Sequence, residues 1–131
     1  MEDSKPVGPP MVTGCKLSKF DDTEDVDQTV YRSMIGSILY ATTTRPDIMH
    51  AVCQVGRFHT SPKTSHLLAF KRIFRYLKGT IEYGLWYPIG NQLDLYAFTN
   101  VEWAGCVDDR KSTSGETFFL GGCLVSWSSK K

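Results

Sequence analysis

The sequence predicts an α+β fold in which three helices are followed by an incomplete antiparallel sheet. Residues 27–80 combine helix caps with apolar residues three and four positions apart, which is the pattern of amphipathic helices. Residues 81–131 change to aromatic and β-branched runs separated by turn residues, which indicates short strands. Residues 1–26 are polar and acidic and contain prolines, so we expect a flexible segment there, with an interaction tail as the alternative.

Three helix starts and one helix end can be read from residues 27–80. Asp27 is a good N-cap for the first helix, and Pro46 suits the first position of the second. We expect Ser61 to cap the third helix, Pro62 to lie in its first turn and the helix to end at Gly79, a natural C′ residue. The apolar residues expected to face the core are Tyr31, Met34, Ile35, Ile38 and Leu39 in the first helix, Ile48, Val52, Val55 and Phe58 in the second, and Leu67, Phe70, Phe74 and Leu77 in the third.

Four short strands are expected in the second half of the chain. They are residues 82–87 (EYGLWY), 93–99 (LDLYAFT), 115–122 (GETFFLGG) and 123–129 (CLVSWSS), of which three are expected to form an antiparallel meander. So few strands are marginally stable unless the helices cover their apolar face. We expect aromatic side chains to fill the junction between helices and sheet, with stacking on nucleic-acid bases as the alternative. These aromatic residues are Tyr76, Tyr83, Trp86 and Tyr87.

The bulk composition excludes several classes of protein. The net charge of +1 argues against a molecule that binds polyanions over its whole surface. The sequence has four cysteines but no CxxC pair and no histidine at ligand spacing, so we expect reduced thiols and no zinc or other cofactor. No apolar run reaches the ~20 residues that cross a bilayer. The first 14 residues lack the apolar segment of a signal peptide, so we expect a cytoplasmic or nuclear protein with no membrane partner.

The third predicted helix carries a basic stripe. Lys71, Arg75 and Lys78 recur at i, i+4 and i+7, Arg72 lies beside them, and Lys63 lies at the start of the helix. Lysine and arginine in such a pattern contact RNA or DNA backbones electrostatically and without sequence preference. The stripe is therefore a candidate for weak nucleic-acid binding, and the alternative is an ordinary solvated helix face.

The stretch YAFTNVEWAG, residues 96–105, ends a predicted strand with an amide at Asn100 and a carboxylate at Glu102. Nucleases that use metal ions often place an aspartate at such a strand end. Magnesium prefers anionic oxygen, and the Asn100 amide offers only a neutral one. The loop that follows contains two acids and two bases, which we expect to form a solvated, internally paired turn in preference to a metal site. These four residues are Asp108, Asp109, Arg110 and Lys111.

Three longer motifs carry a family resemblance. The stretches YRSMIGSILYATTTRPDI, KRIFRYLKGTIEYGLWY and DDRKSTSGETFFLGGCLVSWSSKK resemble the Ty1/copia retrotransposon polyprotein, where reverse transcriptase ends and ribonuclease H begins. The resemblance runs from about residue 4 to residue 131. It implies a helical thumb or connection segment over residues 27–80 and an incomplete RNase H-like sheet over residues 81–131.

The same resemblance implies that the chain is not an enzyme. In copia-type elements the strand before WAG resembles YSDSDWAG, and its first aspartate is the leading metal ligand of RNase H. Asn100 occupies that position here, and Glu102 replaces the second aspartate. The next catalytic acid is implied in a segment resembling SSTEAEY, which would lie beyond Lys131. Because two-metal hydrolysis needs several convergent carboxylates, we expect no catalytic residues and no bound metal.

The chain also resembles proteins described as secreted RxLR effectors of plant-pathogenic oomycetes, which are non-enzymatic proteins that alter defence and cell death in the plant host. The nearest RxLR-like string is Arg72-Ile73-Phe74-Arg75, with Arg75-Tyr76-Leu77-Lys78 overlapping it, and the amphipathic pattern of the helix explains both strings. We therefore predict a non-catalytic protein that acts through binding surfaces. Its most concrete version is a secreted effector that acts in the host cell on an unknown host protein. The alternative is an inactive polyprotein fragment that binds nucleic acid weakly.

Overall fold

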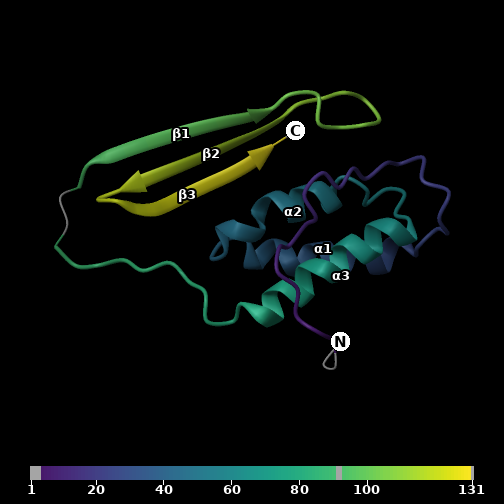
Figure 1. Ribbon diagram of the computed structural model, residues 1–131, viewed down its shortest axis with the longest axis horizontal. Coiled ribbons are helices and arrows are strands. Elements are labelled where there is room, and N and C mark those ends of the chain that lie inside the picture. The colour runs from purple at the N-terminus through teal and green to yellow at the C-terminus, as the bar shows by residue number, and fades with distance from the viewer. Residues whose placement is uncertain (1–3, 91–92, 131) are drawn as a thin grey trace.

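The computed structural model describes residues 4–90 and 93–130, and it places a layer of helices beneath a three-stranded sheet (Figure 1). This confirms the predicted α+β class and the order of helices before strands. The sheet is antiparallel with the strand order β1-β2-β3. The elements are α1 (Gln28–Ala41), α2 (Pro46–Gly56), α3 (Thr64–Gly79), β1 (Leu95–Glu102), β2 (Thr113–Leu120) and β3 (Cys123–Lys130).

The helices begin where local chemistry favours them, with one correction. The Asp27 carboxylate accepts the backbone N–H of Val30 and caps α1, and Pro46 is the first residue of α2, as predicted. The start of α3 was predicted wrongly, because Lys63 and not Ser61 is its N-cap. The Pro62 carbonyl accepts Val26 N–H, which holds this stretch in an extended pairing with the N-terminal segment and delays the helix. The prediction that this helix ends at Gly79 is confirmed, with Gly79 as the last helical residue and Thr80 as the C-cap.

The core lies between the three helices. Its buried apolar residues are Tyr31, Ile35, Ile38, Ile48, Ala51, Val52, Val55, Phe70, Ile73 and Tyr76. The predicted faces of α1 and α2 are confirmed except at Leu39, which is exposed. On α3, Phe70 is fully buried and the other predicted residues are half-buried against the core, but three residues that were not predicted, His66, Ile73 and Tyr76, are buried as well. The Tyr31 hydroxyl donates to the Val55 carbonyl at 2.9 Å, so this buried polar group is satisfied.

The expected strand at residues 82–87 does not form, and the sheet therefore has three strands instead of four. This stretch belongs to the long connection from α3 to β1 (Figure 1). Its aromatic residues favour a strand only when a partner strand is available, and Tyr87 contacts the sheet through its side chain instead, donating to the Leu124 carbonyl at 2.7 Å. Tyr83 and Trp86 are exposed, so the expectation that they fill the junction was wrong. The predicted turn residues Asn91 and Gln92 lie outside the described residues.

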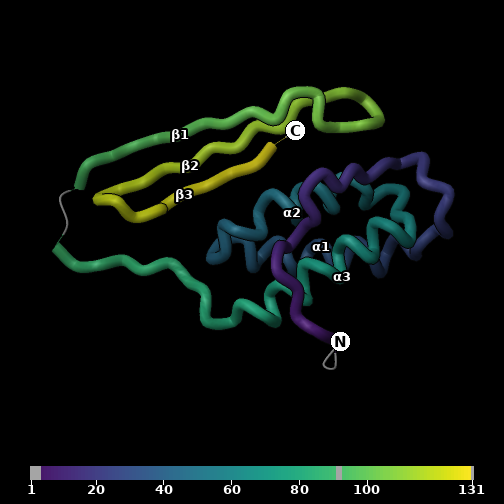
Figure 2. Tube along the Cα trace, in the orientation of Figure 1, coloured from purple at the N-terminus to yellow at the C-terminus, as the bar shows by residue number. Residues whose placement is uncertain are grey.

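The N-terminal segment lies across the helices (Figure 2). We call residues 4–18 the strap. Its side chains Val7, Met11 and Leu17 are half-buried against the helical core. At its end, the Ser18 carbonyl lies 2.9 Å from Nε2 of the buried His66. Thus the polar composition of this region coexists with a few apolar residues that contact the core.

Candidate functional site

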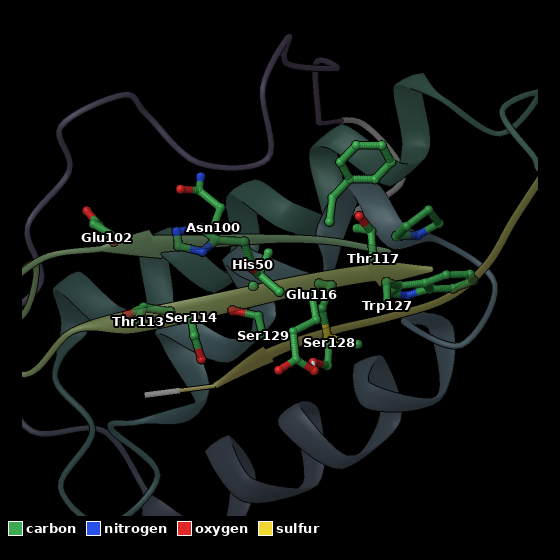
Figure 3. A pocket seen from close by; sticks show the side chains of 15 residues that line it. His50, Asn100, Glu102, Thr113, Ser114, Glu116, Thr117, Trp127, Ser128 and Ser129 are labelled. Atoms are coloured by element: carbon green, nitrogen blue, oxygen red, sulfur yellow. Dashed lines mark hydrogen bonds between the residues drawn. The ribbon is translucent and has the colours of Figure 1, made fainter. Parts of the chain in front are cut away.

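The end of β1 forms one wall of a groove against α2. Phe98, Asn100 and Glu102 alternate along β1 and share the face that looks toward the helices, where a groove of about 430 Å³ also includes His50. Figure 3 shows Asn100 and Glu102 pointing to the same side, with Glu116 on the other side of the sheet. The structure therefore brings together the two residues that the sequence singled out.

Asn100 and Glu102 are poorly suited to bind a metal ion. The Glu102 carboxylate lies directly against Gly105, where an added Cβ would approach it within 2.6 Å, so the carboxylate is folded back onto its own loop. Asn100 contributes an uncharged amide. Among the described residues, no three histidine, cysteine or acidic side chains are grouped so that they could hold a metal ion. One carboxylate and one amide offer a divalent cation little of the anionic oxygen that it requires.

The acidic turn between β1 and β2 is only in part the internally paired loop that was expected. Lys111 Nζ lies 3.7 Å from the Asp109 carboxylate, which confirms that pair. Asp108 instead binds the N-terminal segment, accepting the Ser18 hydroxyl and the backbone N–H of Lys19 at 2.8 Å. The correction has a simple cause, because the folded N-terminal segment brings two donors to a carboxylate that is distant in sequence.

The basic residues of α3 contact the strap. Arg72 Nε donates to the Pro9 carbonyl at 3.1 Å and Arg75 Nε to the Lys5 carbonyl at 2.7 Å. Lys78 Nζ lies 3.1 Å from the Ser4 carbonyl. Lys71 is exposed. Three of the four candidate nucleic-acid-binding side chains are thus directed to main-chain carbonyls of this same chain.

The RxLR-like string lies within the folded helix. Ile73 is fully buried in the core, and the Phe74 ring lies 5.1 Å from that of Phe70. The flanking Arg72 and Arg75 donate to the strap. Recognition of this string as an extended motif would therefore require the middle of α3 to unfold.

A polar cluster between α2 and α3 escaped the sequence reasoning. Arg45 donates to both Asp47 oxygens, at 3.0 and 2.7 Å, and to the carbonyl and hydroxyl of Thr80, while the Tyr76 hydroxyl donates to Asp47 at 2.6 Å. Burial raises the pKa of Asp47, but the hydrogen bonds from Arg45 and Tyr76 outweigh it, and the pKa lies below its ordinary value. The signal was the string TRPDI, residues 44–48, from which the sequence analysis used only Pro46 as a helix start.

A second missed residue is His66. Its ring is fully buried, stacks on Phe58 at 3.8 Å, and lies 3.0 Å through Nδ1 from the Lys63 backbone nitrogen. Burial lowers the pKa of His66, against the opposing effect of the Ser18 carbonyl. A neutral ring that accepts at Nδ1 and donates at Nε2 satisfies both partners. His66 therefore fastens the strap to the start of α3.

Comparison with known proteins places this geometry in context. No family model and no solved structure matches the chain. It is 45% identical over 131 residues to the retrovirus-related Pol polyprotein from transposon RE1 of Arabidopsis thaliana, and 39% identical over 137 residues to that from transposon TNT 1-94 of Nicotiana tabacum. These alignments cover 100% and 99% of the chain but only 9% and 10% of the polyproteins.

A third relative is much shorter. The chain is 42% identical over 102 residues to Secreted RxLR effector protein 161 of Plasmopara viticola, and the alignment covers 77% of this chain and 72% of that protein. Separately, within the described residues no helix is both long and apolar enough to span a bilayer.

Proposed function

We propose that the chain is a non-catalytic relative of the copia-type retrotransposon Pol polyproteins, to which it is 39–45% identical, and that it acts through binding surfaces. The observation that carries this proposal is the pair at the end of β1. Asn100 stands where the family resemblance implies the leading metal ligand, and the Glu102 carboxylate is folded against Gly105. A divalent cation at this place would meet too little negative charge for two-metal hydrolysis.

The test is a nuclease assay on an RNA–DNA hybrid in magnesium. We expect no degradation of the RNA strand by the protein. We also expect none by Asn100→Asp, because two carboxylates, one at position 100 and one from Glu102, are fewer than two-metal hydrolysis requires. Cleavage by the wild-type chain that stops on addition of EDTA would overturn the non-catalytic proposal.

We propose the basic face of α3 as the binding surface, with a nucleic-acid backbone as the ligand. Lys71, Arg72, Arg75 and Lys78 are presented along one helix within a chain of net charge +1, so the binding would be local, weak and sequence-blind. Four neutralised phosphates correspond to a loss of affinity of roughly 100-fold between 50 and 200 mM salt. Such a salt dependence would distinguish contact with the nucleic-acid backbone from stacking of bases on exposed aromatic residues.

The corresponding experiment measures binding of a hybrid oligonucleotide at several salt concentrations. Replacing the four basic residues of α3 with alanine should weaken binding and flatten its salt dependence. Lys111→Ala is the matched control, since this exposed lysine lies on the β1–β2 turn away from α3. Equal binding by the wild type and the α3 variant would reject this surface.

The second candidate is an effector function in a plant host, favoured by the similarity to Secreted RxLR effector protein 161 over most of that protein's length. Such a role needs no catalytic centre, which agrees with Asn100 and Glu102. Expression in plant cells should change the host cell-death response, and Asn100→Asp should leave the change intact. A response identical to that of an empty vector would remove this candidate.

A further inference from the structure

The strap occupies the same donors that the proposed nucleic-acid surface would use. Arg72, Arg75 and Lys78 each point to a strap carbonyl, at distances between 2.7 and 3.1 Å. A carbonyl oxygen and a phosphate oxygen are acceptors for the same guanidinium and ammonium groups. One arginine N–H cannot make a short, linear hydrogen bond to both at once.

Several other contacts hold the strap in place. Pro6 packs against Gly79 so closely that a Cβ added at Gly79 would lie 2.8 Å from the Cβ of Pro6. Val7 and Met11 rest on the helical core, and the Ser18 carbonyl lies within hydrogen-bond distance of His66. A ligand that takes the α3 donors must therefore displace apolar contacts as well as hydrogen bonds.

We infer that the strap is a built-in competitor of nucleic acid for α3: the backbone of a nucleic acid and the residue 4–18 segment bind this face in a mutually exclusive way. The inference rests on the proposed nucleic-acid function and adds its regulation. When the strap is docked, Arg72, Arg75 and Lys78 contact strap carbonyls, and affinity is low although Lys71 and Lys78 are exposed. When the strap leaves, the full stripe is available. The apparent affinity equals the affinity of the open form scaled by the fraction of molecules that are open.

A glycine-to-alanine substitution, which adds one methyl group, can test this competition. Gly79→Ala forces Pro6 to move, whereas Gly36→Ala on α1 meets no atom within 4 Å. Both positions are helical and exposed, so any gain in helix propensity is shared and the second variant is a matched control. We expect Gly79→Ala to bind a hybrid oligonucleotide at low salt about 3- to 10-fold more tightly than the wild type, because it raises the open fraction. Gly36→Ala should bind like the wild type.

A second variant locks the strap instead of releasing it. Pro6→Cys combined with Gly79→Cys places two thiols where a shift of about 1 Å brings the Cβ atoms to the separation of a disulfide. The oxidised protein should lose most of its binding, and reduction of the same sample should restore it.

The outcomes distinguish the two proposals. If Gly79→Ala, Gly36→Ala and the wild type bind equally while alanine at the four basic residues still weakens binding, the competition is wrong and the nucleic-acid function stands. The competition is also wrong if the oxidised, locked protein binds as tightly as its reduced form. Absence of binding by every variant overturns both. Tighter binding by Gly79→Ala together with loss on locking is the result we expect.

Discussion

The helical part and the sheet differ in how completely they bury their side chains. Tyr31, Phe70 and Ile73 are fully buried among three helices, and the strap packs against the outside of this helical core. In β1, by contrast, all eight residues are exposed, with apolar side chains on both faces. Because apolar burial is the main favourable term in folding, the helices carry most of the stability and the sheet depends on them.

The sheet is attached to the helices through a few directed contacts. Trp127 Nε1 donates to the Thr42 carbonyl at 2.8 Å, and the Cys53 thiol donates to the Ser129 carbonyl at 3.2 Å. Burial raises the pKa of Cys53, so this thiol remains a donor. The attachment therefore runs mainly through β3 and α2, and β1 lies farthest from it (Figure 1).

The largest expected effect tests this difference directly. Phe70→Ala should lower the free energy of unfolding by about 3–5 kcal/mol, because it removes a fully buried ring that contacts Phe74 and Tyr31. Phe98→Ala in β1 makes the same chemical change at a ring that is 61% exposed and should cost below about 1 kcal/mol. Urea unfolding followed by circular dichroism measures both. Equal losses would mean that the sheet is packed as tightly as the helices.

The polar cluster between α2 and α3 should give the next largest effect. Asp47→Ala leaves the Arg45 guanidinium and the Tyr76 hydroxyl without their shared acceptor, at a cost of about 2 kcal/mol. The matched control is Asp25→Ala, which removes an ion pair to Lys63. The Asp25 side chain is 79% exposed, so this substitution should cost below about 0.5 kcal/mol. If both substitutions cost the same in thermal or urea unfolding, the cluster is an ordinary surface pair.

Local signals predicted the helical half well, and they failed where distant segments meet. Asp27, Pro46 and the 3–4 spacing are properties of neighbouring residues, and the structure confirms the helices that they predict. The start of α3 depends on pairing between Val26 and Pro62, which no local pattern encodes. The predicted strand at residues 82–87 failed for a related reason, since strand formation requires a partner as well as β propensity.

The candidate sites show the same division. The juxtaposition of Asn100 and Glu102 followed from strand alternation and could be predicted. The basic stripe of α3 was also visible in the sequence, but its contacts with Lys5 and Pro9 were not, because a polar, proline-containing segment reads as flexible. Only the folded chain reveals that these acceptors lie beside those donors.

His66 links the strap to the helices, and its titration should sharpen the comparison. Burial lowers the pKa of His66 below 6.5, the value of an unfolded chain, although the Asp21 and Asp108 carboxylates oppose the shift and Lys63 adds to it. The unfolded state therefore binds the proton first. The contribution of neutral His66 to the free energy of unfolding is therefore complete above pH 6.5. It is lost as the pH falls below that value, by up to about 1.4 kcal/mol per pH unit.

Unfolding measured between pH 7 and pH 5 tests this expectation. His66→Gln should flatten the slope in that range, whereas His50→Gln, at an exposed histidine of α2, should keep it. A wild-type protein whose stability does not change over this range would contradict the role of a neutral His66.

The smallest expected effect concerns the attachment of the sheet. Trp127→Phe keeps an aromatic ring but removes the donor to the Thr42 carbonyl, which should cost about 1 kcal/mol. Trp103→Phe, at a side chain that is 85% exposed beyond β1, is the matched control and should be nearly neutral. Because the lost bond joins β3 to the helices, amide exchange should quicken in the sheet and stay unchanged in the core of α3. Faster exchange throughout both regions would show instead that helices and sheet unfold as one unit.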